Sequence, residues 1–315
     1  MTDPGGFTVV GETLIDLIAR PGLAEPARHL GGSPANVAVG LARLGKTAHL
    51  VTQTGSDAFG EFARARLAAE GVRVIEAGPD APASTALATL DDHGRAEYTF
   101  NVRWNVTRIP VPADSAAVHV GSLGLILEPG SQEVMHLLAG RLRRGHWLVS
   151  LDPNIRADLL GARSAARSRL RRAAALAHIV KLSDEDLDFL FPGSEPHHVR
   201  DLLLREPGRT MLVVVTLGSA GALAATERHQ VHVPAFKVPV ADTVGAGDAF
   251  MSSLLAGLAE ENVHSPGGLT ELAAAGPEPI GRLVARASAA AAITCGRTGA
   301  NPPTATELAE FLASH

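Results

Sequence analysis

From residue 116 onward, short apolar runs alternate with segments in which apolar side chains recur every three or four positions. The runs predict buried strands, and the recurring spacing predicts amphipathic helices. Strands are expected near Val118, Leu148, Ile179, Leu212 and Leu223, and helices near 131–144, 163–177, 184–206, 246–260, 280–295 and 304–313. Strands that alternate with helices favour a mainly parallel sheet covered by helices on both faces, so we expect an α/β fold.

The N-terminal part of the chain has a similar pattern. A strand is expected at 8–17, and a helical pattern after Pro34 stops at Gly45. A second strand at 48–51 precedes a helix that Asp57 can cap, and another strand follows at 72–76. These elements fit the same α/β class.

Residues 83–111 differ from the rest of the chain. The segments 84–90 and 96–102 are rich in residues that favour strands, and a polar turn at 91–94 separates them. This arrangement predicts a hairpin with no helix of its own to pack on. We therefore expect one large domain over 1–315, with a small β-sheet lid formed by about 12–33 and 83–111.

The composition favours a small-molecule partner. Of the 315 residues, 46% are hydrophobic, which is enough for a large core, and the net charge is −5. This charge lacks the basic footprint of proteins that bind nucleic acid or anionic membranes. Cys295 is the only cysteine, so an intrachain disulfide is excluded. Because the chain also lacks the features of a signal peptide and an apolar run of membrane-spanning length, we expect a cytoplasmic protein.

The sequence from Asp242 to Phe250 carries the first candidate chemistry. Gly245 and Gly247 flank Ala246 just before an amphipathic pattern, so they are expected at a helix N-terminus. There, unpaired backbone N–H groups and the helix dipole can hold an anion wherever side chains are small. Asp248 would repel an anion, but it could take the proton of an attacking hydroxyl group, as phosphoryl transfer requires. The alternative is a glycine-rich turn with Asp248 as an ordinary first-turn acid.

A second glycine-rich turn, from Gly31 to Asn36, also leads into a helical pattern. Its glycines would let a ligand approach the backbone, and Asn36 offers both a donor and an acceptor to hydroxyl groups. The alternative is a tight turn in which Asn36 acts as a local cap. The two turns together indicate a site that binds a hydroxylated molecule next to an anion.

Together the two turns resemble the two signatures of the ribokinase family of carbohydrate kinases, also called the PfkB family. The resemblance covers nearly the whole chain. It implies a three-layer α/β/α domain with a β-sheet lid, and transfer of the γ-phosphoryl group of ATP to a hydroxymethyl group with Mg²⁺. It also implies a base at Asp248, an anion hole at the backbone of Gly245, Ala246 and Gly247, and sugar-binding positions at Asp16, Gly31, Gly32 and Asn36.

Other segments resemble the family less closely. Residues 216–221 are similar to its nucleotide loop, so the implied nucleotide-binding positions are Lys181, Ser183, Thr216, Gly218, Ser219 and Gly221. Two further candidates for substrate binding are Arg156 and Glu128. Arg156 ends a segment of the form seen in fructokinase-like and keto-deoxy-gluconate kinase members, and it could neutralise phosphate charge. Glu128 follows a strand, where sheet topology places ligands. The alternatives are a strand-ending turn, a surface arginine and an exposed loop acid.

The magnesium segment departs from the family pattern. Where the family often has an asparagine followed three residues later by a glutamate, this chain has Ser183 and Asp186. Asp186 is one methylene shorter, so it is expected to act on Mg²⁺ through water. The alternative is that Ser183 simply caps a helix whose first turn is acidic.

A monovalent-cation site is also implied by the resemblance. Asp242, the carbonyl group of Val244, and Gly299 in the turn 297–300 match positions where many family members hold potassium beside the anion hole. Pro303 stands where some members have a serine ligand, and this departure weakens the case. Activation by K⁺ over Na⁺ is nevertheless expected.

We therefore predict an ATP-dependent sugar kinase with fructose as the acceptor, and with ATP, Mg²⁺ and K⁺ as cofactors. A 2-keto-3-deoxygluconate kinase or a ribokinase is the alternative. Arg103, near the end of the expected lid, could clamp an acid sugar or be a solvated strand-end charge. A silent sugar-binding regulator on the same fold is the non-enzyme alternative, and such a protein would not need Asp248. A homodimer through the lid is a further expectation.

Overall fold

Nine strands form the central sheet of the protein, whose computed structural model describes residues 5–19, 25–90, 96–141, 147–156, 159–160, 162–204 and 210–315. The strands are β1 (Gly6–Val10), β4 (Ala48–Thr52), β5 (Arg73–Glu76), β8 (Ser115–Gly121), β9 (Leu148–Asp152), β10 (Ile179–Ser183), β11 (Leu212–Thr216), β12 (Ala222–Ala225) and β13 (Gln230–Val233). Their order is β13-β12-β11-β10-β9-β8-β1-β4-β5, and only the pairs β11–β12 and β12–β13 are antiparallel. The predicted mainly parallel sheet is therefore confirmed.

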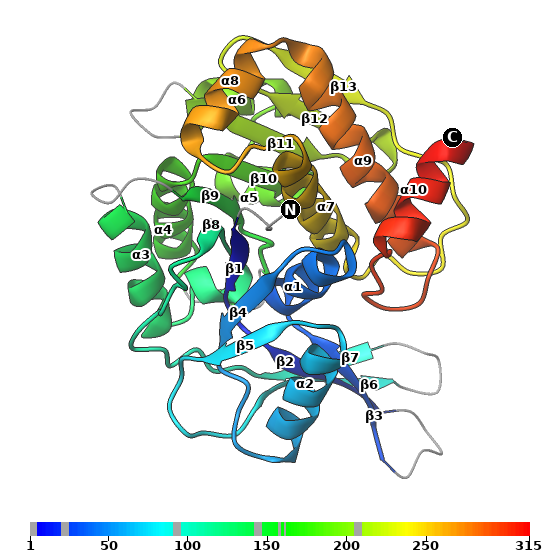
Figure 1. Ribbon diagram of the computed structural model, residues 1–315. Coiled ribbons are helices and arrows are strands. Elements are labelled where there is room, and N and C mark those ends of the chain that lie inside the picture. The colour runs from blue at the N-terminus through cyan, green and yellow to red at the C-terminus, as the bar shows by residue number, and fades with distance from the viewer. Residues whose placement is uncertain are drawn as a thin grey trace.

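Helices cover both faces of this sheet and make a three-layer fold (Figure 1). Successive residues of a strand point to opposite faces, so Ala117 belongs to one buried core and Val118 to the other. The first core includes residues of α1 (Ser33–Arg43), α2 (Ala58–Ala69), α7 (Ala246–Glu260), α8 (Pro266–Ala274), α9 (Pro277–Cys295) and α10 (Ala305–Ser314). The second includes residues of α3 (Gly130–Arg141), α4 (Arg163–Leu176), α5 (Asp184–Leu190) and α6 (Pro196–Leu204). Strands that are buried on both faces read as continuous apolar runs, which is why the sequence located them well.

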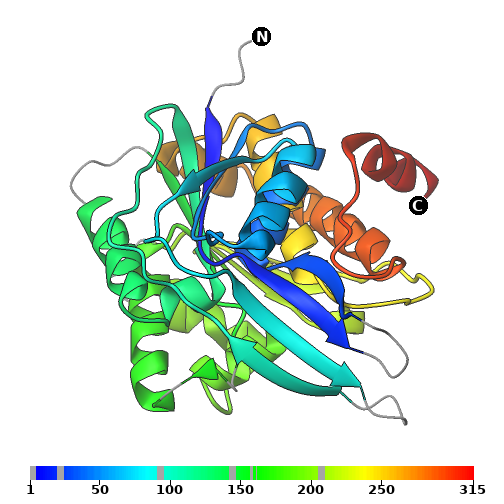
Figure 2. The same cartoon turned by 90° about the horizontal axis from the view of Figure 1, so that it is seen from below.

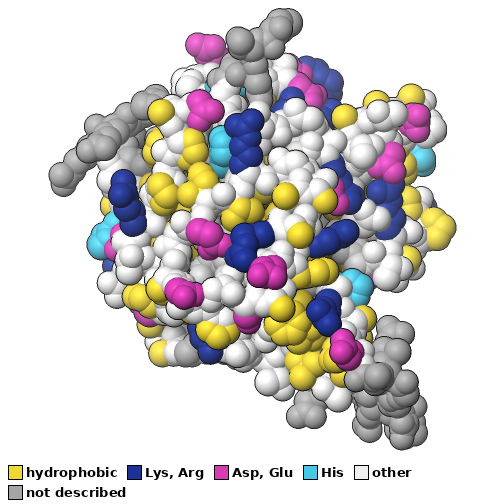
Figure 3. Space-filling model, turned by 60° about the horizontal axis from the view of Figure 1, so that its bottom comes forward, with side chains coloured by type: hydrophobic (Ala, Val, Ile, Leu, Met, Phe, Trp, Pro, Cys, Tyr) yellow, Lys and Arg dark blue, Asp and Glu magenta, His cyan; other side chains and the backbone are white. Residues whose placement is uncertain are grey.

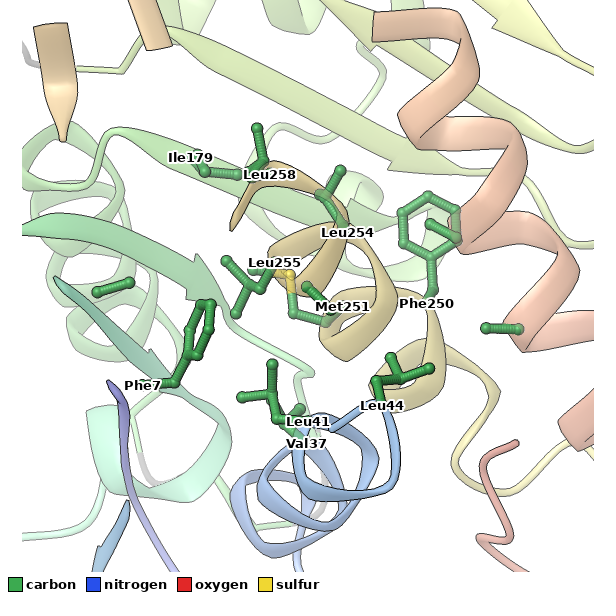
Figure 4. Close-up of a cluster of buried hydrophobic side chains, with 14 of the residues drawn as sticks. Phe7, Val37, Leu41, Leu44, Ile179, Phe250, Met251, Leu254, Leu255 and Leu258 are labelled. Carbon is green, nitrogen blue, oxygen red and sulfur yellow. The ribbon is translucent and has the colours of Figure 1, made fainter. Parts of the chain in front are cut away.

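The two helices that follow the glycine-rich turns, α1 and α7, pack directly against each other. Val37 and Leu41 of α1 point toward Met251 and Leu255 of α7 (Figure 4). Glycine at position 40 permits this close approach, because a Cβ atom there would lie 2.3 Å from the hydroxyl oxygen of Ser252. The packing fixes the first turn of one helix relative to the first turn of the other.

A second sheet of four strands projects beside the central sheet (Figure 2). It contains β2 (Leu14–Ala19), β3 (Ala27–Gly31), β6 (Ser84–Leu90) and β7 (Ala96–Asn101), in the order β3-β2-β6-β7. The antiparallel pair β6–β7 confirms the predicted hairpin, although its turn at 91–94 lies outside the described residues. Strand β3 was not predicted individually, although it lies within the segment 12–33 that was expected to form part of the lid.

Two predicted elements are wrong. The single strand at 8–17 is divided into β1 of the central sheet and β2 of the small sheet. Gly11 lies between them with φ at 156°, and a Cβ atom there would collide with Pro34 at 2.3 Å. The single helix at 184–206 is also divided, into α5 and α6, because Pro192 and the left-handed Gly193 (φ 74°) end the first one.

The residues that the structure describes can be characterised by helix hydropathy and by surface charge. Within the described residues, no helix has both the length and the apolar character needed to cross a bilayer. On the face drawn in Figure 3, basic and acidic side chains of the described residues lie interspersed. This face therefore carries charges of both signs and not a field of a single sign.

Candidate active site

The two glycine-rich turns meet at the carboxylate of Asp248. This side chain is in the first turn of α7, and the residue is only 4% exposed. The hydroxyl group of Ser33 donates to Oδ1 at 2.6 Å, and the amide of Asn36 donates to Oδ2 at 2.8 Å. Asn154 donates a longer bond of 3.4 Å to Oδ1. The reading of Asn36 as a purely local cap is therefore incomplete, because its amide reaches a residue 212 positions away in the chain.

The turn before Asp248 forms a cradle that side chains would fill. Gly245 precedes α7 in the left-handed conformation with φ at 77°, and a Cβ atom there would lie 2.6 Å from Ala300. A Cβ atom on Gly247 would lie 2.9 Å from the Nζ atom of Lys181. The first N–H groups of a helix have no partner inside the helix, and its N-terminus is positive. This geometry fits the predicted anion hole.

A buried ion pair lies beneath the cradle. The Nζ atom of Lys181 donates to Oδ2 of Asp152 at 2.9 Å, and both residues are almost completely buried. Burial raises the pKa of Asp152 to about 6, against the opposing effect of the ammonium group. Burial lowers the pKa of Lys181, but the carboxylates around it outweigh this effect and raise the pKa overall, so the ammonium stays charged. Asp152 was not among the candidate site residues, although it opens the segment that ends at Arg156.

On the small sheet, Asp16 of β2 lies opposite His29 of β3. The turn at Gly31 comes close to it, because a Cβ atom there would lie 2.2 Å from Oδ2 of Asp16. Burial raises the pKa of Asp16 to about 6, while the charges of His29 and Arg156 act in the opposite direction. Asp16 of the small sheet and Arg156, in the loop after β9, therefore interact electrostatically, and both were predicted to bind the substrate.

The predicted magnesium segment forms a helix cap. The hydroxyl oxygen of Ser183 accepts from the N–H of Asp186 at 3.0 Å, and Oδ2 of Asp186 accepts from the N–H of Ser183 at 2.9 Å. Oδ1 of Asp186 accepts from the N–H of Ile155 at 2.7 Å. Each oxygen of Asp186 thus has one donor already and keeps one lone pair. No group of three metal-binding side chains occurs within the part of the chain that the structure describes.

The residues predicted for a monovalent cation are brought together by Asp242. Its carboxylate accepts from the N–H of Val244 at 3.0 Å and from the N–H of Gly299 at 2.9 Å. These two bonds hold the pKa of Asp242 below its usual range. Asp242 therefore ties the loop before the cradle to the turn at 297–300.

The predicted nucleotide loop begins where β11 ends. Thr216 is paired with Ser183 at the end of the neighbouring strand β10, and its hydroxyl donates to the carbonyl oxygen of Leu182 at 3.3 Å. Gly218 and Gly221 both have positive φ, at 53° and 97°, and Ser219 lies between them in a short 3₁₀ turn. The carboxyl ends of these parallel strands share one edge of the sheet, where α/β proteins bind ligands.

The last two candidate substrate-binding residues are Glu128 and Arg103. Glu128 forms an ion pair with Arg169 of α4, so a role in substrate binding would require it to leave this pair. The backbone N–H of Arg103 donates to the hydroxyl oxygen of Ser84 at 3.0 Å. The Nη1 atom of Arg103 is buried and has no hydrogen-bond partner among the described residues.

Sequence analysis missed Glu12, which is buried at the junction between the two sheets. Its Oε2 atom accepts from the N–H of Gly124 at 3.0 Å, in the 3₁₀ turn Ser122–Leu125 that follows β8. Burial raises the pKa of Glu12 from 4.5 to about 7, despite hydrogen bonds that favour the charged form. The signal available in the sequence was an acid, Glu12, directly after Gly11. Acids in loops are too common for this position alone to indicate a functional residue.

This pKa has a measurable consequence for stability. Folding raises the pKa of the Glu12 carboxyl group, so protonated Glu12 favours the folded state. This contribution to the free energy of unfolding is complete below pH 4.5 and is lost as the pH rises through about 7. A shift of this size corresponds to roughly 3 kcal/mol. We expect the wild-type protein to lose up to that much unfolding free energy relative to Glu12→Gln between pH 4.5 and 8, measured by urea denaturation. The control is Glu310→Gln, because Glu310 is exposed. If the free energy of unfolding changed with pH in the same way for the wild type and for Glu12→Gln, the expectation would be wrong.

Comparison with known proteins identifies the family of this chain. Residues 7–307 match the pfkB family carbohydrate kinases. The chain is 39% identical over 277 residues to a fructokinase of Klebsiella pneumoniae, an alignment that covers 85% of this chain and 89% of that protein.

Solved structures give the same result. The chain resembles a Vibrio cholerae fructokinase with fructose, ADP and calcium ion bound (TM-score 0.81, 29% identity, 98% of this chain and 99% of that one). A double mutant of that enzyme with fructose, ADP and potassium ion bound has a TM-score of 0.80 at 28% identity, over 98% of each chain. A Xylella fastidiosa fructokinase with bound ATP has a TM-score of 0.82 at 27% identity, also over 98% of each chain. The chain therefore belongs to the pfkB family of carbohydrate kinases, which are phosphotransferases with an alcohol group as acceptor.

Proposed function

We propose that the protein transfers the γ-phosphoryl group of ATP to a hydroxymethyl group of fructose. The observation that carries this proposal is the buried carboxylate of Asp248, which two donors from the Gly31–Asn36 turn hold at the mouth of a helix N-terminus. One related fructokinase structure holds fructose and ADP, and another holds ATP. These ligands support fructose and ATP as the substrates of this protein. A sugar-binding regulator would have no use for a carboxylate in this place.

In the proposed reaction Asp248 is the base. Its carboxylate takes the proton of the acceptor hydroxyl as that oxygen forms a bond to the γ-phosphorus, and the bond from phosphorus to ADP breaks with its electron pair leaving on ADP. The backbone of Gly245, Ala246 and Gly247 stabilises the negative charge on the transferring group. Lys181, whose Nζ atom lies beneath Gly247, adds a buried positive charge at the same place.

The nucleotide is proposed to lie along the edge formed by the ends of β10 and β11, with Ser183, Thr216, Gly218, Ser219 and Gly221 around its phosphates. Magnesium fits beside them, because Oδ1 of Asp152 is buried without a partner among the described residues and Asp186 keeps free lone pairs. Both carboxylates are suited to hold the water shell that Mg²⁺ retains. When bound, the ion would neutralise phosphate charge.

A potassium site is proposed next to the anion hole, with the carbonyl group of Val244 and the turn at Gly299 as its frame. Potassium in a related fructokinase supports it. We expect severalfold higher turnover in KCl than in NaCl at equal ionic strength, because K⁺ would rigidify the loop that carries the anion hole. Equal rates in the two salts would remove this site.

The acceptor is proposed to lie between the two sheets. Asp16, Asn36 and the backbone of Gly31 and Gly32 suit the vicinal hydroxyl groups of a neutral sugar. Arg156 is close enough to Asp16 to lower the pKa of that carboxyl group electrostatically, so it is proposed to take part in binding the acceptor. The small sheet, with its adjoining segments at about 12–33 and 83–111, is proposed as the lid, and its edge strands β3 and β7 are the surfaces through which two copies could pair.

One observation favours an acid sugar, 2-keto-3-deoxygluconate, as the alternative acceptor. The buried Nη1 atom of Arg103 has no partner among the described residues, and a carboxylate would supply one. Fructose remains our first choice, because relatives that are 36% and 39% identical to this chain are fructokinases.

The test compares kcat/KM for fructose, ribose and 2-keto-3-deoxygluconate, then repeats the panel with Arg103→Ala. We expect fructose to be preferred, with little response to the substitution, because a neutral sugar needs no ionic clamp. Arg28→Ala is the matched control, because it removes an exposed arginine of β3 in the same proposed lid. Preference for the acid sugar that is lost in Arg103→Ala would establish the alternative, and sugar binding without turnover would establish the regulator.

A further inference from the structure

Ser33 makes the shortest hydrogen bond to the carboxylate of Asp248. Its hydroxyl group donates to Oδ1 at 2.6 Å, the distance of a strong charge-assisted bond. Both residues are buried, at 8% and 4% exposure. Asp248 is the one hydrogen-bond partner that the described residues give to this hydroxyl group. The hydroxyl group of Ser33 therefore bonds to the proposed base and does not cap α1, whose N-cap residue is Gly32.

The donors are divided unequally between the two oxygens of Asp248. Oδ1 accepts from Ser33 and, at 3.4 Å, from Asn154, so both of its lone pairs have a donor. Among the residues that the structure describes, Oδ2 accepts only from Asn36, at 2.8 Å, and keeps one lone pair. An acceptor hydroxyl group can donate to Oδ2 without displacing any of these bonds.

We propose that Ser33 is a positioning residue, whose bond to Oδ1 fixes the plane of the Asp248 carboxylate so that Oδ2 receives the substrate proton. This inference rests on the proposed function. The terminal torsion of an aspartate is broad, so its carboxylate plane must be set by its partners. Ser33 sets it from the first residue of α1, which the packing of α1 on α7 holds in place. The acceptor hydroxyl group then finds the free lone pair already aimed at it.

The first experiment measures steady-state rates of ATP-dependent fructose phosphorylation for Ser33→Ala. We expect kcat to fall roughly tenfold to hundredfold, the cost of a misaligned catalytic group, while KM for ATP stays near the wild-type value. Ser33→Thr keeps the hydroxyl group and should retain most of the rate. Ser252→Ala is the matched control, because Ser252 is also a buried serine between α1 and α7 but its hydroxyl bonds to the carbonyl of Ala249. It should have the wild-type rate.

The second experiment places Ser33→Ala in the Asp248→Asn background. If Ser33 acts through the base, the double variant should be no slower than Asp248→Asn alone. An equal fold loss in both backgrounds, or a wild-type rate for Ser33→Ala alone, would overturn the inference. Failure of the proposed function would look different, because the wild-type protein would then phosphorylate no sugar or Asp248→Asn would keep the wild-type rate.

Discussion

Replacing Asp248 by asparagine is expected to lower turnover by roughly a hundredfold to ten-thousandfold, which is the usual effect of losing a general base. The amide cannot accept the proton of the attacking hydroxyl group, but it has almost the same shape as the carboxylate. Binding of ATP should stay equal or become tighter, because a negative charge near the phosphates is removed. Steady-state kinetics and calorimetric titration with ATP measure the two effects separately.

The control for this prediction addresses the alternative in which Asp248 is an ordinary first-turn acid. Asp184 is such an acid, exposed in the first turn of α5. Asp184→Asn should change neither kcat nor KM. If Asp248→Asn also kept near wild-type turnover, Asp248 would be a structural residue and the assignment of the base would fail.

Replacing Gly247 by valine is expected to abolish most turnover, by at least the roughly hundredfold to thousandfold that removal of one donor from an anion hole costs. The new side chain would occupy the cradle where the transferring phosphoryl group must touch the backbone. Its Cβ atom alone would lie 2.9 Å from the Nζ atom of Lys181, so the ammonium group must shift as well. The loss should appear in kcat for fructose phosphorylation.

Gly140→Val is the matched control for this substitution. Gly140 is also a helical glycine, in α3, but a Cβ atom added there meets nothing within 4 Å. It changes helix propensity in the same direction as Gly247→Val, without entering the cradle. Circular dichroism should show both variants folded. A folded Gly247→Val enzyme with the activity of Gly140→Val would contradict the anion-hole geometry.

The amino-acid sequence by itself determined most of the central fold. The strands at Leu148–Asp152 and Leu212–Thr216 are buried on both faces, so each is a mainly apolar run that can be recognised locally. Caps are equally local, and the predicted cap of α2 is confirmed because the Asp57 side chain accepts from the N–H of Gly60. Local patterns failed where a strand changes sheets. Residues 8–10 and 14–17 are both rich in strand-forming residues, so the sequence did not reveal the break between them. In the structure Pro34 lies so close to Gly11 that no Cβ atom fits at this break.

Within the site, the sequence located the residues whose neighbours in the chain reveal their chemistry, namely the glycine-rich turns around Asp248 and Asn36. Only the tertiary structure decided what meets them. The ends of strands β9 and β10 come together because of the order of the sheet, and this order brings Lys181 and Asp152 beneath Gly247. The packing of α1 on α7 likewise aims Ser33 at Asp248 from 215 residues away. Hydrophobic periodicity reports which face of an element is buried, but it carries no information about which elements become neighbours, so such contacts cannot be read from the chain.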